Sequence, residues 1–102
     1  MAQKIVHMVI FCLTHEKDSK ETRKFLMDGK EILSRIPGVN NFEVTLQVSN
    51  KNDYDYAFSM EFIDQAAYNL YNEHTNHKDF VENRWKTEVS RFLEIDLVRE
   101  KD

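Results

Sequence analysis

The hydrophobic positions of this chain repeat with two different periods, and their succession predicts the order of its secondary structure. Residues 5–14 are apolar at both odd and even positions apart from His7 and Thr14, which is typical of a strand covered on both faces. Residues 39–49 and 54–63 alternate apolar and polar side chains, as expected of two further strands. The polar run 50–53 predicts a turn, so these two strands should pair antiparallel. The apolar faces of the two strands are predicted to hold Phe42, Val44, Leu46 and Val48, and Tyr54, Tyr56, Phe58, Met60 and Phe62.

A helical period separates the first and second predicted strands. Its N-terminus can be capped by Asp18 with Glu21 or by Ser19 with Thr22, and Pro37-Gly38 is expected to stop it. The apolar residues at helical spacing are Phe25, Leu26, Ile32, Leu33 and Ile36.

A second helical region follows the third predicted strand. Asp64 is its expected N-terminal cap, and Thr75-Asn76 is a plausible interruption. A last strand is expected at about residues 92–99. The apolar residues at helical spacing before the interruption are Ala66, Ala67, Leu70 and Tyr71, and those after it are Phe80, Val81, Trp85 and Val89.

The resulting order is strand, helix, strand, strand, helix, strand, which predicts an α+β fold of the ferredoxin-like βαββαβ type. Right-handed crossovers place both helices on the same face of such a sheet and leave the other face bare. Because the first strand is apolar on both sides, the bare face also needs a cover, and a second copy of the chain is the simplest one. We therefore expect a homodimer whose two sheets form a dimeric α+β barrel.

Composition narrows the possible partners. The 102 residues, 41% of them hydrophobic, suit one domain spanning 1–102. A net charge of −4 with interspersed signs argues against a nucleic-acid partner. The single cysteine, Cys12, reads as a buried small hydrophobe that suits a reducing compartment. The apolar stretch 5–13 is too short for a membrane span and lacks the features of a signal peptide, so we expect a cytoplasmic protein without a membrane partner.

The candidate chemistry lies in four ring side chains. Tyr71, His74 and His77 fall within seven residues, and His7 interrupts the most apolar strand. Imidazoles change charge near neutral pH, so this group is where a binding or catalytic site is expected. A buried His7 also needs a hydrogen-bond partner, which could be a ligand, His77, Tyr71, a second chain or a water molecule. The alternative for His77 and Tyr71 is a structural role in a helix cap and in the core.

Five segments carry a resemblance to a known family. They are 5–7 with Phe11, 36–39, 54–62, 71–77 and 94–96. Their order and separation resemble the stress-responsive A/B barrel family, whose members are dimeric α+β barrels. The chain departs from that pattern at Thr75, where the family usually has proline, and at Thr45, where it commonly has glycine.

The resemblance also implies site residues. A similar plant enzyme is a polyketide cyclase that forms olivetolic acid, and His7, Tyr71 and His77 match its catalytic positions. By that resemblance His77 is a general base and Tyr71 binds or orients the substrate. A neutral imidazole beside a phenol suits a ring-closing aldol reaction, because one removes a proton and the other stabilises the developing negative charge. His74 matches a position that the family often keeps.

Three functions remain open. The first is binding of a small apolar or aromatic molecule, for which the further lining candidates are Phe11, Tyr56, Phe58, His74 and Trp85. The second is a cyclase or lyase acting through His77, and the third is a structural stress protein with a filled barrel. We expect no cofactor. We also expect no metal, because His74 and His77 lack a third ligand. Trp85 prompts a fold-level analogy with haem-degrading proteins and cofactor-independent monooxygenases, although its spacing with Val81 and Val89 is typical of a core position.

Overall fold

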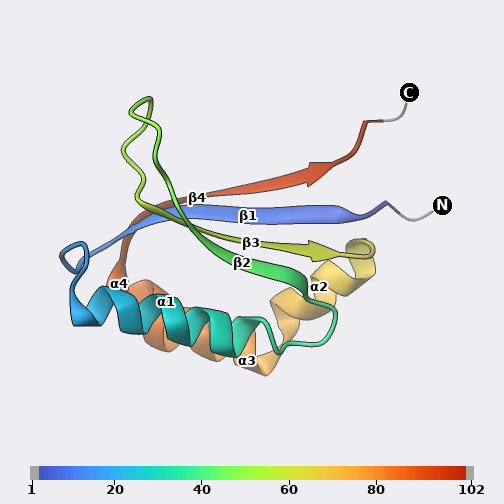
Figure 1. Ribbon diagram of the computed structural model, residues 1–102. Coiled ribbons are helices and arrows are strands. Elements are labelled where there is room, and N and C mark those ends of the chain that lie inside the picture. The colour runs from blue at the N-terminus through green and yellow to red at the C-terminus, as the bar shows by residue number, and fades with distance from the viewer. Residues whose placement is uncertain (1–2, 101–102) are drawn as a thin grey trace.

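The computed structural model describes residues 3–100, which form a four-stranded antiparallel sheet with the helices on one of its faces (Figure 1). The strands lie in the order β2-β3-β1-β4. The predicted ferredoxin-like arrangement is confirmed, although the second helical region consists of several short consecutive pieces. In chain order the elements are β1 (Ile5–Leu13), α1 (Lys20–Leu33), β2 (Asn40–Leu46), β3 (Tyr56–Phe62), α2 (Gln65–Glu73), α3 (Thr75–Phe80), the π-helical η1 (Val81–Trp85), α4 (Lys86–Glu88) and β4 (Val89–Val98).

The helix-facing side of the sheet carries the core. Side chains alternate between the faces of a strand, so every second residue of β1 and β3 points toward the helices. The register places these residues opposite one another, and all of them are buried. The pairs are Ile5 with Phe62, His7 with Met60, Val9 with Phe58, and Phe11 with Tyr56. His7 is therefore a polar residue in an otherwise apolar or aromatic layer.

The opposite face of the sheet carries an apolar stripe that no helix of the described residues covers (Figure 1). Leu93 and Leu97 in this stripe are 49% and 50% exposed. We call it the outer stripe, and it consists of Val6, Met8 and Ile10 of β1 with their register partners Leu97, Ile95 and Leu93 of β4. The predicted apolarity of β1 on both faces is thus confirmed.

Helix α1 begins at the second of the two predicted caps, because the Ser19 hydroxyl accepts a hydrogen bond from the Thr22 backbone nitrogen at 3.1 Å. The helix ends at Leu33, four residues before the expected stop at Pro37. Ile36 nevertheless stays buried, because the turn after the helix keeps it in the core. None of the helices in the described part of the chain is long and apolar enough to cross a membrane.

The two central strands of the sequence are shorter than predicted. β2 ends at Leu46, and Val48 beyond it is 92% exposed, so the expectation that Val48 belongs to the apolar face was wrong. The β2–β3 register shifts between Asn40 and Glu43, where Asn41 has a positive φ of 53°. β3 begins only at Tyr56, which leaves Tyr54 outside the strand under the guanidinium of Arg91. The antiparallel pairing of β2 with β3 is confirmed.

The second helical region breaks at His74 and not at Thr75-Asn76. Asp64 caps α2 as predicted, accepting a hydrogen bond from the Ala67 backbone nitrogen at 2.9 Å. His74 then adopts an extended backbone, with φ −65° and ψ 138°, and its Nδ1 accepts from the Asn76 backbone nitrogen at 3.1 Å. The side chain of His74 therefore ends α2 and starts α3. β4 begins at Val89, three residues earlier than the expected Phe92.

Candidate functional site

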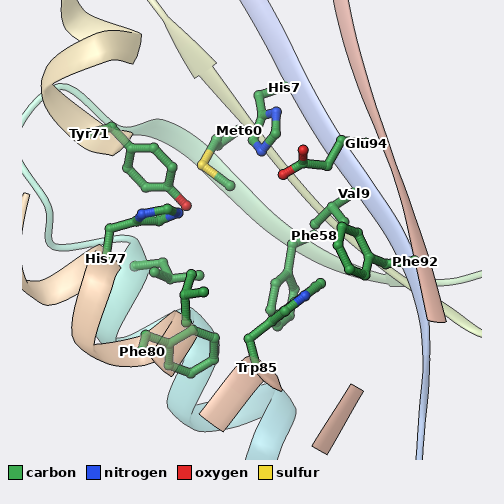
Figure 2. A pocket seen from close by; sticks show the side chains of 12 residues that line it. His7, Val9, Phe58, Met60, Tyr71, His77, Phe80, Trp85, Phe92 and Glu94 are labelled. Atoms are coloured by element: carbon green, nitrogen blue, oxygen red, sulfur yellow. The ribbon is translucent and has the colours of Figure 1, made fainter. Parts of the chain in front are cut away.

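A cavity of about 230 Å³ lies between the sheet and the helices, and its wall is mostly apolar (Figure 2). Three of the four predicted ring side chains line it: His7 from β1, Tyr71 from α2 and His77 from α3. Glu94 of β4 is the further polar residue of the wall. The apolar part of the wall consists of Val9, Leu33, Phe58, Met60, Phe80, Val81, Trp85 and Phe92.

His7 reaches the cavity with one ring nitrogen already engaged. Its Nδ1 lies 2.6 Å from Oδ1 of Asp96 and 3.0 Å from the hydroxyl of Tyr68, and that hydroxyl also lies 3.0 Å from Oδ2 of Asp96. A carboxylate only accepts hydrogen bonds, so Nδ1 donates to it and the proton of the ring is held on that side. In Figure 2 the other nitrogen points toward the cavity. Asp96 and Tyr68 therefore settle the question of which group satisfies the buried histidine.

Tyr71 and His77 form a second pair, with ring centroids 4.5 Å apart. Figure 2 shows the Tyr71 hydroxyl pointing toward the imidazole. Tyr71 is 2% exposed, and burial raises the pKa of its phenol, so the hydroxyl keeps its proton and can donate it. Burial also lowers the pKa of His77, and this outweighs the opposing effect of the Asn72 backbone. His77 is therefore a neutral imidazole at neutral pH, which is the form that can accept a proton.

The helix break at His74 positions the second pair. Tyr68 and Tyr71 are three residues apart on α2 and both are buried, so they face the sheet together. His77 and Phe80 are likewise three residues apart on α3, and both line the cavity. Because the break redirects the chain after α2, two short helices rather than one long helix contribute to the same wall. The Nδ1 atom of His77 is buried there, and within the described residues it has no hydrogen-bond partner.

The structure does not bring every predicted site residue to the cavity. Phe58 and Trp85 line it together with the three rings, but Phe11, Tyr56 and His74 do not. Phe11 is fully buried beneath Phe58 and Trp85, with ring centroids 4.9 Å from each. Tyr56 lies at the start of β3, and His74 is used as a helix cap.

Trp85 combines both roles that its spacing left open. It packs against Phe11, Phe25 and Phe58 in the core, and it also forms part of the cavity wall. Its ring meets Phe92 of β4 edge-on at a centroid distance of 5.5 Å. The large indole therefore closes one end of the cavity while it anchors η1 to the sheet.

Sequence reasoning missed the acidic side of the site. Glu94 lies in the cavity wall, and Asp96 holds His7. The sequence does carry a signal for these carboxylates, because they alternate with the apolar residues of β4 at positions 93, 95 and 97 and so share the other face of the strand. The sheet register then puts Glu94 opposite Val9 and Asp96 opposite His7. Tyr68 was missed because a tyrosine on an amphipathic helix looks like an ordinary core residue.

Within residues 3–100, no group of three or more His, Cys, Asp or Glu side chains is placed so that it could hold a metal ion. Nδ1 of His74 accepts the hydrogen bond that caps α3.

The sequence matches the model of the stress responsive A/B barrel domain over residues 5–99. The chain belongs to this family. Comparison with curated proteins finds no match. A solved structure of similar sequence is a Dabb family protein with a ferredoxin-like fold from Mesorhizobium loti, which is 52% identical, with 97% of this chain and 99% of the other covered and a TM-score of 0.96.

Two more distant structures share the fold of this stress responsive A/B barrel protein. One is a dimeric ferredoxin-like protein of unknown function from Thermobifida fusca, at 12% identity, with 97% and 93% of the two chains covered and a TM-score of 0.75. The other is a hydroxynitrile lyase from Passiflora edulis, at 8% identity, with 100% and 98% covered and a TM-score of 0.84. At these identities the likeness concerns the fold alone.

Proposed function

We propose that the protein binds a small, mostly apolar molecule with one polar end in the cavity at His7, Tyr71 and His77. The observation that carries the proposal is the convergence of these three rings on one largely apolar wall. Apolar side chains can bury the body of a ligand while the imidazoles and the phenol bind its polar end. A cavity of about 150 Å³ can hold benzene, so 230 Å³ suits one substituted aromatic ring.

Titration with small aromatic molecules, followed by ¹H–¹⁵N NMR, tests this proposal. A panel of monocyclic alcohols, phenols and amides should shift resonances of the cavity wall, including the Trp85 indole and the His77 ring. His77→Phe keeps an aromatic ring in place but removes its nitrogens, and it should weaken binding about tenfold, the usual cost of one lost hydrogen bond in a closed site.

The matched control is His74→Asn. It removes the neighbouring imidazole but keeps an oxygen that can cap α3, as Nδ1 of His74 does now. Binding should be unchanged in this variant. If no member of the panel shifts the wall resonances, the binding proposal is rejected and a purely structural role becomes the better account.

We further propose that the protein is a homodimer joined through the outer stripe. Six apolar residues of β1 and β4 form this stripe, and Leu93 and Leu97 within it remain half exposed in the single chain. A contiguous apolar patch of this kind usually marks an interface. The fold relative from Thermobifida fusca is described as dimeric. Light scattering should therefore report twice the mass of the 12.2 kDa chain.

A second candidate function is enzymatic: a lyase or a polyketide-cyclase-like reaction with His77 as general base and Tyr71 as hydrogen-bond donor. The observation that favours it is the buried pair itself, because a neutral imidazole can take a proton while a protonated phenol stabilises the resulting oxyanion. A hydroxynitrile lyase shares this fold, so the fold is compatible with an enzyme. The comparison is an analogy of fold only.

Hydrogen exchange at carbon tests the base directly. Acetophenone carries acidic protons next to its carbonyl group, and a cavity base should speed their replacement by deuterium in D₂O. The wild-type protein and His74→Asn should both accelerate the exchange, and His77→Phe should not, while light scattering shows the same assembly for all three. An exchange rate equal to that of buffer rejects the enzymatic candidate and leaves ligand binding.

A further inference from the structure

The charge of the cavity is unbalanced. Among its twelve lining residues, all within the described part of the chain, Glu94 carries a full charge and none is Lys or Arg. Glu94 is exposed on β4, so it lies at the mouth of the cavity rather than at its base. Figure 2 shows its carboxylate directed toward the space below His7. A ligand that enters therefore meets one negative charge.

The neighbouring groups increase this imbalance. Asp96, two residues further along the same face of β4, is a second carboxylate beside the cavity and faces His7. Burial keeps His77 neutral at the opposite wall. The negative charge of Glu94 also acts inside the cavity. It helps to raise the pKa of Tyr71, although burial and Tyr68 contribute more.

The basic side chains of the neighbourhood are engaged elsewhere. Arg84 of η1 binds Glu88 and Asp28, and Arg91 contacts Asp53 and lies over the Tyr54 ring. Neither lines the cavity. No Lys or Arg side chain of residues 3–100 therefore lines the cavity to receive a carboxylate or phosphate ligand, and the lining His7 is already paired with Asp96.

We infer that Glu94 is a specificity-determining residue that makes this cavity reject anionic ligands and accept neutral or cationic ones with a hydrogen-bond donor. This inference rests on the proposed binding function and narrows its ligand class. A carboxylate ligand would face like charge in a partly desolvated space, whereas an amide, hydroxyl or amidinium group can donate to Glu94. The apolar wall is equally suited to all of them, so charge is what separates them.

Three ligands of nearly the same shape test the inference. Benzoate, benzamide and benzamidine share a ring and a planar three-atom head group, and they differ in charge from −1 through 0 to +1 at neutral pH. Their dissociation constants should be measured by NMR titration at low ionic strength, where surface charges are least screened. Benzoate should bind the wild-type protein about tenfold or more weakly than benzamide, and benzamidine at least as tightly as benzamide.

The variant Glu94→Gln removes the charge and nearly keeps the shape. It should bring the three dissociation constants to within about threefold of one another, which is less than the tenfold spread expected for the wild-type protein. Glu31→Gln is the control, because Glu31 is a 63% exposed carboxylate on α1 paired with Arg35, and its loss should leave the wild-type order intact.

Two results overturn the inference while sparing the binding proposal: benzoate binding to the wild-type protein as tightly as benzamide does, or an order that is the same in Glu94→Gln. If none of the three ligands nor the neutral panel shifts a cavity resonance, the binding proposal itself fails, and the inference falls with it. Thermal unfolding of each variant confirms that the comparison is made on folded protein.

Discussion

His7 and Asp96 face each other across neighbouring strands, with Nδ1 of the imidazole 2.6 Å from Oδ1 of the carboxylate. The Tyr68 hydroxyl lies within 3.1 Å of both side chains. This arrangement fixes the orientation of His7 inside an apolar layer, because the carboxylate determines which ring nitrogen carries the proton. The second nitrogen is then left for whatever occupies the cavity.

Replacing Asp96 with asparagine should change the tautomer of His7. An amide can donate to Nδ1, so the proton of the neutral ring should move to Nε2, which long-range ¹H–¹⁵N NMR of the imidazole distinguishes. The free energy of unfolding should fall by about 1 kcal/mol, because the Asp96 side chain is 46% exposed and solvent screens the pair.

Tyr68→Phe is the comparison variant for this prediction. It removes a hydroxyl that contacts both partners but leaves the carboxylate as the acceptor, so the wild-type tautomer should remain. The same tautomer in wild-type protein and Asp96→Asn would show that Asp96 does not orient the ring.

Burial of His77 predicts a specific pH dependence of stability. The pKa of the folded residue is lowered from its ordinary value of 6.5, so between these two values the unfolded chain binds more protons than the folded chain. The free energy of unfolding should therefore fall as the pH drops from 6.5 toward the lowered pKa, and the contribution should be fully present above 6.5.

Denaturation at a series of pH values measures this dependence. The quantity of interest is the free energy of unfolding of the wild-type protein minus that of His77→Phe, because the other titratable groups are common to both chains. This quantity should fall toward acidic pH. A difference that stays constant from pH 7 to the acid limit of folding would mean that His77 is not desolvated.

Dimer formation through the outer stripe should be sensitive to one charge. Ile95 pairs with Met8 at the middle of the stripe, so Ile95→Lys should place an ammonium group in the interface and yield a monomer in light scattering. Leu70→Lys is the matched control, because Leu70 is a 67% exposed leucine on α2. A dimer that survives Ile95→Lys, or one that Leu70→Lys disrupts, would place the interface elsewhere.

Gly29 allows α1 to approach the cavity wall. A Cβ at this position would lie 2.5 Å from the ring of Phe58, which lines the cavity. Gly29→Ala should therefore lower the free energy of unfolding by ~1 kcal/mol, since overpacking costs ~1–3 kcal/mol and the better helix propensity of alanine returns up to ~1 kcal/mol. The displaced ring should also reduce the space for a ligand.

Gly38→Ala separates these two effects. Gly38 has a φ of 92°, and a Cβ there would make only ordinary contacts with Ala67 at 3.5 and 3.8 Å, so alanine strains the backbone without approaching the cavity. Both variants should be less stable in thermal unfolding, but Gly29→Ala alone should weaken binding of benzamide. Equal binding by the two variants would show that Phe58 does not limit the cavity.

Much of the fold could be predicted because the hydrophobic period is a local property of the chain. The two-sided apolarity of β1 and the Asp64 cap are read directly from neighbouring residues. The early end of α1 at Leu33 and the break at His74 could not be predicted in the same way. Each depends on a local hydrogen bond, from the Ile36 backbone nitrogen to the Leu33 carbonyl or from the Asn76 backbone nitrogen to Nδ1 of His74, which hydrophobic spacing does not reveal. Pro37 and Thr75 were misleading local signals.

The candidate site was predicted in part for a related reason. His7 was conspicuous because it interrupts an apolar strand, and Tyr71 and His77 were conspicuous because they fall within seven residues together with His74. The groups that determine their chemistry did not stand out. Asp96 acts on His7 through the β1–β4 register, and a sequence does not reveal which strands become neighbours. The same register explains why Glu94 belongs to the cavity wall.

A crystal structure of the protein soaked with benzamide tests the central claim most directly. We expect electron density for the ring among the apolar residues of the cavity wall, with the amide group within hydrogen-bond distance of His77, Tyr71 or His7. Density confined to the protein surface, or a cavity closed by repacked side chains at saturating benzamide, would contradict it.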